Sequence, residues 1–355
     1  MLEFGFFDTF GRAEKSDLAG AYDAHIAAVQ LAEQLGYGYY FFIEHQNAKY
    51  PVICSPSVYL AAVARATSTI RIGAMVFALP FHHPVRLAQD AAMVDQLSRG
   101  RLEFAVGYGT RAPEFEPWHL DFGQRREIGV EVMEVVLKAW ASDTLDHEGA
   151  YFQFTGASPQ PRPYQQPHPP VWMGAHSETS MDYAADMNFN VAQNLDTEPV
   201  ATQKFEYWRR AWHARGHSGV MPRTLFVRHV HVAETDEQAR AEAEPFLREG
   251  ILGQAGVVRA ASLRPDEKNP AMLEIARIAL ETTRSYGFWI DEGLAFIGSP
   301  KTVERLLREQ QVRMGYDIFC AHHQITSMPI ELALSSLRLF GESVIPALRG
   351  AVPVG

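Results

Sequence analysis

The sequence predicts an α/β protein built as a (β/α)8 TIM barrel with insertions over the barrel mouth. Strand-like and helix-like segments alternate along most of the chain, loops follow the apolar strands, and one stretch contains a complete parallel βαβ unit. Alternation sustained over this length favours a barrel over an open doubly wound sheet. We expect one domain, residues 1–355, with an inserted segment at about 248–290.

The clearest βαβ unit lies between residues 71 and 109. Residues 70–76 and 102–106 are apolar and rich in strand formers, and residues 85–97 have helical periodicity that Gly100 ends. The apolar stripe of this helix consists of Leu87, Ala91, Val94 and Leu97. A strand, a helix and a second strand, with a loop after each strand, form a parallel unit.

The other elements follow from the same periodicities. Further strands are expected at 2–7, 39–43, 171–173, 190–192, 225–232 and 317–321. Further helices are expected before Gly36 and at 57–66, 126–140 and 330–348. Residues 144–154 indicate a hairpin, and six prolines between 158 and 170 exclude regular structure there. Residues 248–290 break the alternation, with a helical pattern at 271–283, which indicates an inserted subdomain.

Composition excludes several classes of function. The formal net charge of −10 leaves no basic surface for nucleic acid. No stretch reaches the roughly 18 apolar residues of a membrane span, and the N-terminus has no basic leader, so we expect no membrane partner and a cytoplasmic protein. Cys54 and Cys320 are too few for a disulfide framework or a cysteine metal site. Both are expected to be reduced and buried.

In a parallel barrel the reacting groups lie just after the strands. Glu44 and His45 follow the second strand, where a histidine can transfer a proton near neutral pH or simply cap the strand in water. Gly107 and Tyr108 follow the fourth strand, where a glycine lets the backbone approach a ligand. The GxG pattern there lacks the third glycine of a dinucleotide fingerprint.

The fifth strand leads into a second candidate segment that contains Ala175, His176, Ser177 and Ser180. Hydroxyls and backbone N–H groups at a helix start can bind an anion, and the same groups serve as an ordinary N-cap. From the residues alone the cap is the more frequent use.

Histidines also occur in pairs, at 82 and 83, at 229 and 231, and at 322 and 323. His229 and His231 share one face of a strand. Metal hydrolases on this fold add acidic and lysine ligands after later strands, and no such set is found here. We therefore expect no metal site.

The motif set resembles the flavin-dependent monooxygenases related to bacterial luciferase. The motifs are LPxxHPxRxAxxxAxxDxLSxGRxxxxVGxG, FIEHQ at the second strand, PVWMGAHSETS, FIGSPKTVERLLREQ and LFGESVIPALR, and they span essentially the whole chain. Single pieces such as LSxGR are shared by deazaflavin-dependent relatives. The set therefore indicates the superfamily better than the reaction.

The resemblance implies roles for particular residues. His45 matches the catalytic histidine of the family's EHH motif, with Gln46 in place of the second histidine. Ala74, Met75 and Val76 match the segment beneath the flavin ring, where relatives have a non-proline cis peptide, expected here between Met75 and Val76. The implied cofactor-binding residues are Glu44, Ala74, Met75, Val76, Gly107, Tyr108, Arg126, Ala175, His176, Ser177 and Ser180.

The phosphate of the flavin is assigned by resemblance to Ser177 and Ser180. Relatives often carry an arginine where this chain has Tyr108, which leaves Arg111 or Arg126 for that charge. His176 stands where luciferases have an acidic residue.

The resemblance implies a monooxygenase that takes reduced FMN from a separate flavin reductase. It would use dioxygen to oxidise a small apolar organic substrate such as an aldehyde, ketone, terpene or alkane, and would form a homodimer or pair with a related subunit. Aromatic residues suit either an apolar cavity or the core: Phe7, Phe10, Phe77, Phe81 and Trp118. The alternatives are a deazaflavin-dependent dehydrogenase and a non-catalytic flavin-binding protein or inactive heterodimer subunit.

Overall fold

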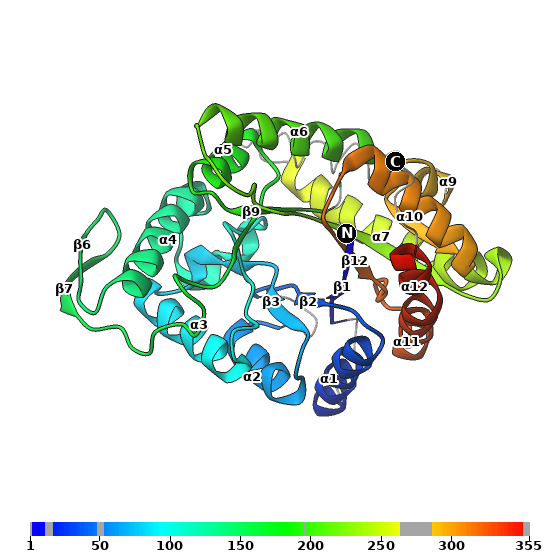
Figure 1. Cartoon of the computed structure of the whole chain (residues 1–355), viewed down its shortest axis with the longest axis horizontal. Coiled ribbons are helices and arrows are strands. Elements are labelled where there is room, and N and C mark those ends of the chain that lie inside the picture. The colour runs from blue at the N-terminus through cyan, green and yellow to red at the C-terminus, as the bar shows by residue number, and fades with distance from the viewer. Residues whose placement is uncertain (1, 11–16, 48–52, 195, 263–285, 351–355) are drawn as a thin grey trace. The chain divides into compact units, whose positions relative to one another are not determined.

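The computed structural model describes residues 2–10, 17–47, 53–194, 196–262 and 286–350 (Figure 1). The chain forms two compact units. The terminal unit comprises residues 1–39 and 175–355, and the central unit comprises residues 40–174. Each unit is described by itself below.

Parallel strands form the sheet of the terminal unit. They are β1 (Glu3–Asp8), β9 (Asn190–Gln193), β10 (Thr224–Val232), β11 (Ala295–Gly298) and β12 (Ile318–His322). His229 of β10 pairs with His322 of β12 and also with Ala295 of β11, so β11 and β12 lie on opposite edges of β10. β9 pairs with β10 up to Phe226. β9 therefore pairs with the first part of β10, and β11 pairs with the last part of β10 on the same edge.

The strands expected at 2–7, 190–192, 225–232 and 317–321 are confirmed to within one residue. The sequence prediction omits β11. This strand has only four residues, AFIG, and it follows the inserted segment directly, where no preceding alternation marks its start.

Helices follow the strands of the terminal unit. They are α1 (Leu18–Gln34), α5 (Glu178–Asp186), α6 (Glu198–Ala214), α7 (Asp236–Ser262), α9 (Tyr286–Asp291), α10 (Pro300–Met314), α11 (Ile330–Leu339) and α12 (Ile345–Gly350). A π-helical turn, Phe340–Val344, joins α11 to α12, so the helix expected at 330–348 is present with one wider turn. The helical pattern expected at 271–283 lies outside the described residues. The inserted subdomain stays a prediction.

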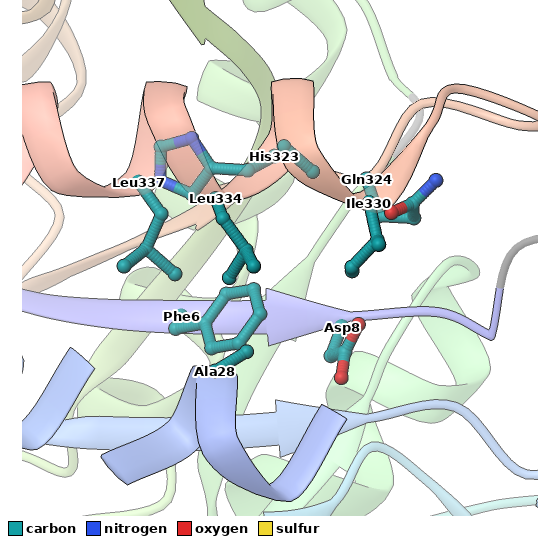
Figure 2. Close-up of a pocket in the computed structure, with 9 residues that line it drawn as sticks. Phe6, Asp8, Ala28, His323, Gln324, Ile330, Leu334 and Leu337 are labelled. Carbon is teal, nitrogen blue, oxygen red and sulfur yellow. The ribbon is translucent and has the colours of Figure 1, made fainter. Parts of the chain in front are cut away.

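A small cavity lies between β1, α1 and α11 (Figure 2). Phe6 and Asp8 reach it from β1, Ala28 from α1, and Leu334 and Leu337 from α11. Its volume of about 10 Å³ is near the smallest that can hold one water molecule. We therefore interpret it as a packing gap.

Asp8 also forms a buried ion pair with His25 of α1. The Oδ2 atom of Asp8 lies 2.7 Å from Nδ1 of His25, and the imidazole stacks on Phe10 with ring centroids 4.1 Å apart. Burial lowers the pKa of His25, but the charge and hydrogen bond of Asp8 outweigh it, and the net pKa is raised. This pair attaches α1 to the end of β1.

The central unit contains β3 (Arg71–Ala74), β4 (Phe77–Ala78), β5 (Phe104–Gly107) and β8 (Val171–Gly174), and all of β2 (Tyr39–Phe42) except its first residue. β5 lies between β4 and β8, with parallel pairing on both edges. Helices α2 (Pro56–Ala66), α3 (Pro84–Ser98) and α4 (Arg125–Ala141) pack successively, α2 on α3 and α3 on α4 (Figure 1). β4 was not predicted, because the strand expected at 70–76 ends at Ala74; the other elements agree with the predicted strands and helices to within about two residues.

Helix α3 corrects one part of the predicted apolar stripe. Leu87, Ala91 and Val94 are buried, but Leu97 is 39% exposed and Ser98 is 1% exposed. At 100° per residue, Ser98 returns to about 20° from Leu87, whereas Leu97 lies about 80° away. The helical period decides burial here over residue hydrophobicity.

Arg101 shows what the LSxGR motif does. Its guanidinium donates to the carbonyls of Ala64, Ile70 and Ser98 at 2.8 Å each, and to the hydroxyl of Thr67 at 2.9 Å. Carbonyls at the end of a helix have no partner within the helix. Arg101 satisfies them and connects the ends of α2 and α3 to the start of β3.

A hairpin of β6 (Leu145–Glu148) and β7 (Gln153–Ala157) confirms the excursion expected at 144–154. Glu131 of α4 is buried beneath it and accepts hydrogen bonds from the backbone N–H groups of Ala150, Tyr151 and Phe152. His147 contacts the same carboxylate at 3.2 Å. Burial raises the pKa of Glu131, but these hydrogen bonds lower it more.

Both cysteines are free. Cys320 is buried as expected, whereas Cys54 is exposed, which corrects the expectation for that residue. Residues 158–170 form neither helix nor strand, in agreement with their six prolines. Among the described helices, none combines the length and the apolar character needed to cross a membrane.

Candidate active site

Glu44 connects the end of β2 to the segment after β3. Its carboxylate is buried and accepts hydrogen bonds from the backbone N–H of Ala78 at 2.9 Å and from Nε2 of Gln46 at 2.8 Å. Nε2 of His82 lies 3.1 Å from both carboxylate oxygens. Both oxygens are therefore engaged, and Glu44 holds backbone and loop in place.

Gln46 replaces the second histidine of the family motif and has a clear role. Besides Glu44, its amide nitrogen donates to the carbonyl oxygen of Cys54 at 2.7 Å. The side chain thus bridges a buried carboxylate and the loop that precedes α2.

His45 points to a different carboxylate. Its Nδ1 atom lies 3.0 Å from Oε1 of Glu114, and these two side chains are 13% and 9% exposed. Glu114 ends a 3-10 turn, Ala112–Glu114, and Arg111 contacts it at the longer distance of 3.6 Å. A histidine paired with a carboxylate after a barrel strand is suited to proton transfer.

The segment after β3 contains the expected cis peptide, between Met75 and Val76. The N–H of Met75 donates to the carbonyl of Phe42 at 2.7 Å. A Cβ atom at Gly107 would lie 2.7 Å from Cγ2 of Val76, and one at Gly174 would lie 3.0 Å from its Cγ1. Val76 therefore occupies the space that side chains at both glycines would need.

Tyr108 and Arg126 interact with each other. Burial raises the pKa of Tyr108 to about 12, and the Arg126 guanidinium opposes that rise. Arg126 itself is exposed near the start of α4, whereas Arg111, the other candidate for the phosphate charge, lies beside Glu114. Arg126 therefore lies beside Tyr108, and Arg111 beside Glu114.

The segment predicted to bind phosphate lies in the terminal unit. Ser177 is the N-cap of α5 and forms a reciprocal capping box with Ser180. Oγ of Ser177 accepts from the N–H of Ser180 at 3.3 Å, and the N–H of Ser177 donates to Oγ of Ser180 at 3.1 Å. The structure shows the cap role of both hydroxyls.

The neighbours of the capping box are now defined. Ala175 is fully buried, and its N–H donates to the carbonyl of Ala192. His176 lies 3.8 Å from the buried carboxylate of Asp196, which also binds Lys204 at 2.8 Å. Burial raises the pKa of Asp196, but His176 and Lys204 lower it more. Sequence reasoning missed Asp196 and Lys204.

The strand-end histidines of the terminal unit stack on each other. The rings of His229 and His322 are 4.5 Å apart, and Nε2 of His322 lies 2.9 Å from the hydroxyl of Thr9. Burial, and then the charge of Arg228, lowers the pKa of His229 to about 4, and burial lowers that of His322. Both rings are therefore neutral at pH 7. Within the described residues, no cluster of three or more His, Cys, Asp or Glu side chains has the geometry to hold a metal ion.

The aromatic residues divide between core and surface. Phe7 and Phe77 are buried, and Phe81 packs on Phe115 with ring centroids 4.6 Å apart. Trp118 is 49% exposed and lies at the edge of this aromatic cluster.

The comparison with known families is decisive. Residues 2–317 match the model of the luciferase-like monooxygenases. The chain belongs to this family. The prediction of a luciferase-like enzyme is thereby confirmed.

Several luciferase-like relatives cover most of this chain. It is 26% identical to the oxygenase component of the flavin-dependent trigonelline monooxygenase of Acinetobacter baylyi, covering 81% of this chain and 88% of the relative. It is also 26% identical to limonene 1,2-monooxygenase of Rhodococcus erythropolis, and the match covers 98% of this chain and 87% of the relative.

A solved relative shows the fold. The oxygenating constituent of 3,6-diketocamphane monooxygenase from Pseudomonas putida, solved in complex with FMN, superposes with a TM-score of 0.78 at 20% identity. The match covers 97% of this luciferase-like chain and 98% of that structure. The predicted barrel class is confirmed by this similarity.

Within this luciferase-like chain the structure brings several predicted residues together. Glu44, His45 and the 74–76 segment lie at the ends of neighbouring strands, connected by Glu44. Glu114 was missed because it follows no apolar run and lies in an irregular, proline-containing stretch. An acidic residue in a loop after a barrel strand was the available signal.

Proposed function

We propose that this protein is the oxygenase of a two-component system. It accepts reduced FMN from a separate flavin reductase and uses dioxygen to oxidise a small apolar organic substrate. The observation that carries the proposal is the pairing of His45 with Glu114, just after the end of β2. The neighbouring residue, Glu44, accepts a hydrogen bond from the N–H of Ala78, which follows the 74–76 segment. The relatives named as an oxygenase component and as an oxygenating constituent support a separate reductase.

In the central unit we assign the ring system of the flavin to the strand ends around Val76. Gly107 has no side chain, Val76 fills the space beside it, and Ala74 is small and buried, so backbone and apolar groups form the surface here. Bound reduced flavin supplies the electrons for the reaction with dioxygen. Cofactor and substrate are held by apolar packing, and Phe81 and Phe115 help to exclude water.

His45 is the proposed proton-transfer group. With Nδ1 directed at Glu114, its Nε2 atom is the one available to accept a proton from, or donate one to, a reacting group. Glu44 does not share this task, because its oxygens are bonded to Ala78, Gln46 and His82.

In the terminal unit we assign the FMN phosphate to the start of α5. The N-terminal end of a helix attracts an anion through its backbone N–H groups and dipole. Ser177 and Ser180 organise that first turn through their capping box, and His176 adjoins it. We also assign Ala175 and Tyr108 to the cofactor site, because their backbone and packing suit it. We assign Arg126 to it because of its positive charge.

We propose the substrate only as a chemical class. Relatives named for limonene and diketocamphane favour a cyclic terpene or ketone among the apolar candidates. A cytoplasmic location and a dimer, with a second copy or a related subunit, stay predictions from the sequence.

Anaerobic titration and coupled turnover test the proposal. Reduced FMN should bind much more tightly than NAD(P)H or a reduced deazaflavin. With a flavin reductase and a panel of aldehydes, cyclic ketones, terpenes and alkanes, mass spectrometry should detect a product that has gained one oxygen atom. Selective binding of the deazaflavin, with hydride transfer and no oxygen uptake, would establish the dehydrogenase alternative instead.

A further inference from the structure

We infer that Glu114 is a positioning residue for His45, and that it selects the ring tautomer with the proton on Nδ1. The catalytic meaning of this role rests on the proposed function, whereas the tautomer itself does not. Glu114 belongs to none of the motifs that define the family resemblance.

The pair itself defines the direction of the hydrogen bond. Oε1 of Glu114 lies 3.0 Å from Nδ1 of His45, and a carboxylate at this distance only accepts. Nδ1 must therefore carry the proton. In the neutral ring Nε2 is then unprotonated and is the basic atom.

Glu44 and Arg111 also lie near the pair, but neither takes the place of Glu114 as the hydrogen-bond acceptor for Nδ1 of His45. Glu44 precedes His45 in the chain, but its carboxylate is bonded to Ala78, Gln46 and His82. Arg111 approaches the same oxygen of Glu114 at 3.6 Å, so His45 is the closer partner.

Glu114 is held rigidly by its neighbours. Its N–H donates to the carbonyl of Arg111 at 3.0 Å, and the next residue, Phe115, is 1% exposed. The Phe115 ring packs on Phe81 and lies against Gly109, whose φ of +77° suits glycine. The carboxylate is therefore placed by a buried anchor and does not depend on a flexible loop residue.

A second contact joins the same two segments. Nδ2 of Asn47 donates to the carbonyl of Pro113 at 3.0 Å, two residues after His45 and one before Glu114. Asn47 thus provides a stringent control, because Asn47→Ala removes this contact and strains a backbone with φ of +48° but leaves the imidazole untouched.

Nitrogen-15 NMR of histidine-labelled protein tests the tautomer without any turnover. The His45 signal is assigned by its loss in His45→Ala. In the wild type we expect Nε2 to be unprotonated and Nδ1 protonated. In Glu114→Ala the Nε2-protonated form should become the major one, Glu114→Asp should restore the native tautomer at least in part, and Asn47→Ala should retain it. An unchanged tautomer in folded Glu114→Ala overturns the inference.

Kinetics test the consequence. Glu114→Ala should lower kcat at least tenfold, with the KM for the substrate changed less than threefold. This effect should vanish in a His45→Ala background, because Glu114 acts through the imidazole. An equal loss in both backgrounds overturns the inference. Absence of oxygenation in the wild type with every substrate refutes the proposed function, while the NMR result still decides the role of Glu114.

Discussion

Gly107→Ala tests the packing beneath the proposed flavin site. The new Cβ would lie 2.7 Å from Cγ2 of Val76, and 3.4 Å from its Cβ and Cγ1. Favourable carbon contacts lie at about 3.5–4.0 Å, so the atoms must separate by roughly 0.8 Å or more. Rotating Val76 about χ1 in one direction moves its other methyl group into the same space, which leaves one alternative rotamer for this β-branched side chain.

Overpacking of this kind costs about 1–3 kcal/mol. We expect a loss of about 2 kcal/mol for Gly107→Ala, because the contact is close and only one other rotamer of Val76 relieves it. Gly174→Ala is the matched comparison, since its nearest contacts are 3.0 Å to Val76 and 3.7 Å to the carbonyl of Val106. We expect about 1 kcal/mol there.

Urea unfolding measures both variants, and the double variant Gly107→Ala with Val76→Ala decides the cause. Removing the two methyl groups of Val76 should recover at least about 1 kcal/mol of the loss. Reduced FMN should also bind more weakly to Gly107→Ala, because the displaced backbone is the proposed ring surface. Simple additivity of the two substitutions, or a loss below about 0.5 kcal/mol, would refute the steric reasoning.

Three further predictions concern proton transfer, phosphate binding and pH. His45→Ala should lower coupled turnover at least tenfold while reduced FMN binds nearly as before, and unchanged turnover at saturating flavin would remove it from the catalytic list. Ser177→Ala with Ser180→Ala should raise the Kd for FMN at least tenfold more than that for riboflavin, because loss of the capping box disorders the backbone N–H groups proposed to bind the phosphate, and charge-assisted bonds contribute roughly 1.5–3 kcal/mol each. Equal losses would indicate only the cap, which contributes about 1 kcal/mol. Asp8 raises the pKa of His25 in the folded protein. The Asp8–His25 pair therefore stabilises the fold fully below pH 6.5, the ordinary pKa of histidine, and this stabilisation is lost as the pH rises through the folded pKa. Urea unfolding of Asp8→Asn should therefore differ from wild type more at pH 6 than at pH 9, and the opposite trend would contradict this account.

The alternation of strands and helices made most of the barrel predictable. Periodicity also identified His45 and Glu44 as candidates, because functional residues of a barrel follow its strands. It failed where elements are short, as in β11, and where a helix end places a serine inside, as at Ser98. The cis peptide at Met75 was available only through family resemblance, since local propensity does not indicate it.

Contacts between loops were beyond sequence reasoning. The pairing of His45 with Glu114 joins residues that are 69 positions apart in the numbering, through a turn with no periodic pattern. The contact of Glu44 with His82 is also non-local, because 38 positions separate the two residues. Position after a strand identifies candidates, and only the three-dimensional contacts separate a proton-transfer group from a structural one.

The way β11 returns to β10 fixes where the excursion between these two strands begins and ends. The chain leaves the sheet after Val232 and rejoins it at Ala295, on the edge of the strand that it left. Val232 pairs with Gly298 and His229 with Ala295, so the two ends of the excursion lie on adjacent strands and are offset by three residues along them. Each doubling of a loop costs only about 0.6 kcal/mol in closure entropy. Ala239, Ala243 and Leu247 of α7 lie in one buried cluster with Trp289 and Leu294, so evolution and protein engineering can change the length of this stretch only outside these core contacts, while the register of β10 and β11 stays the same.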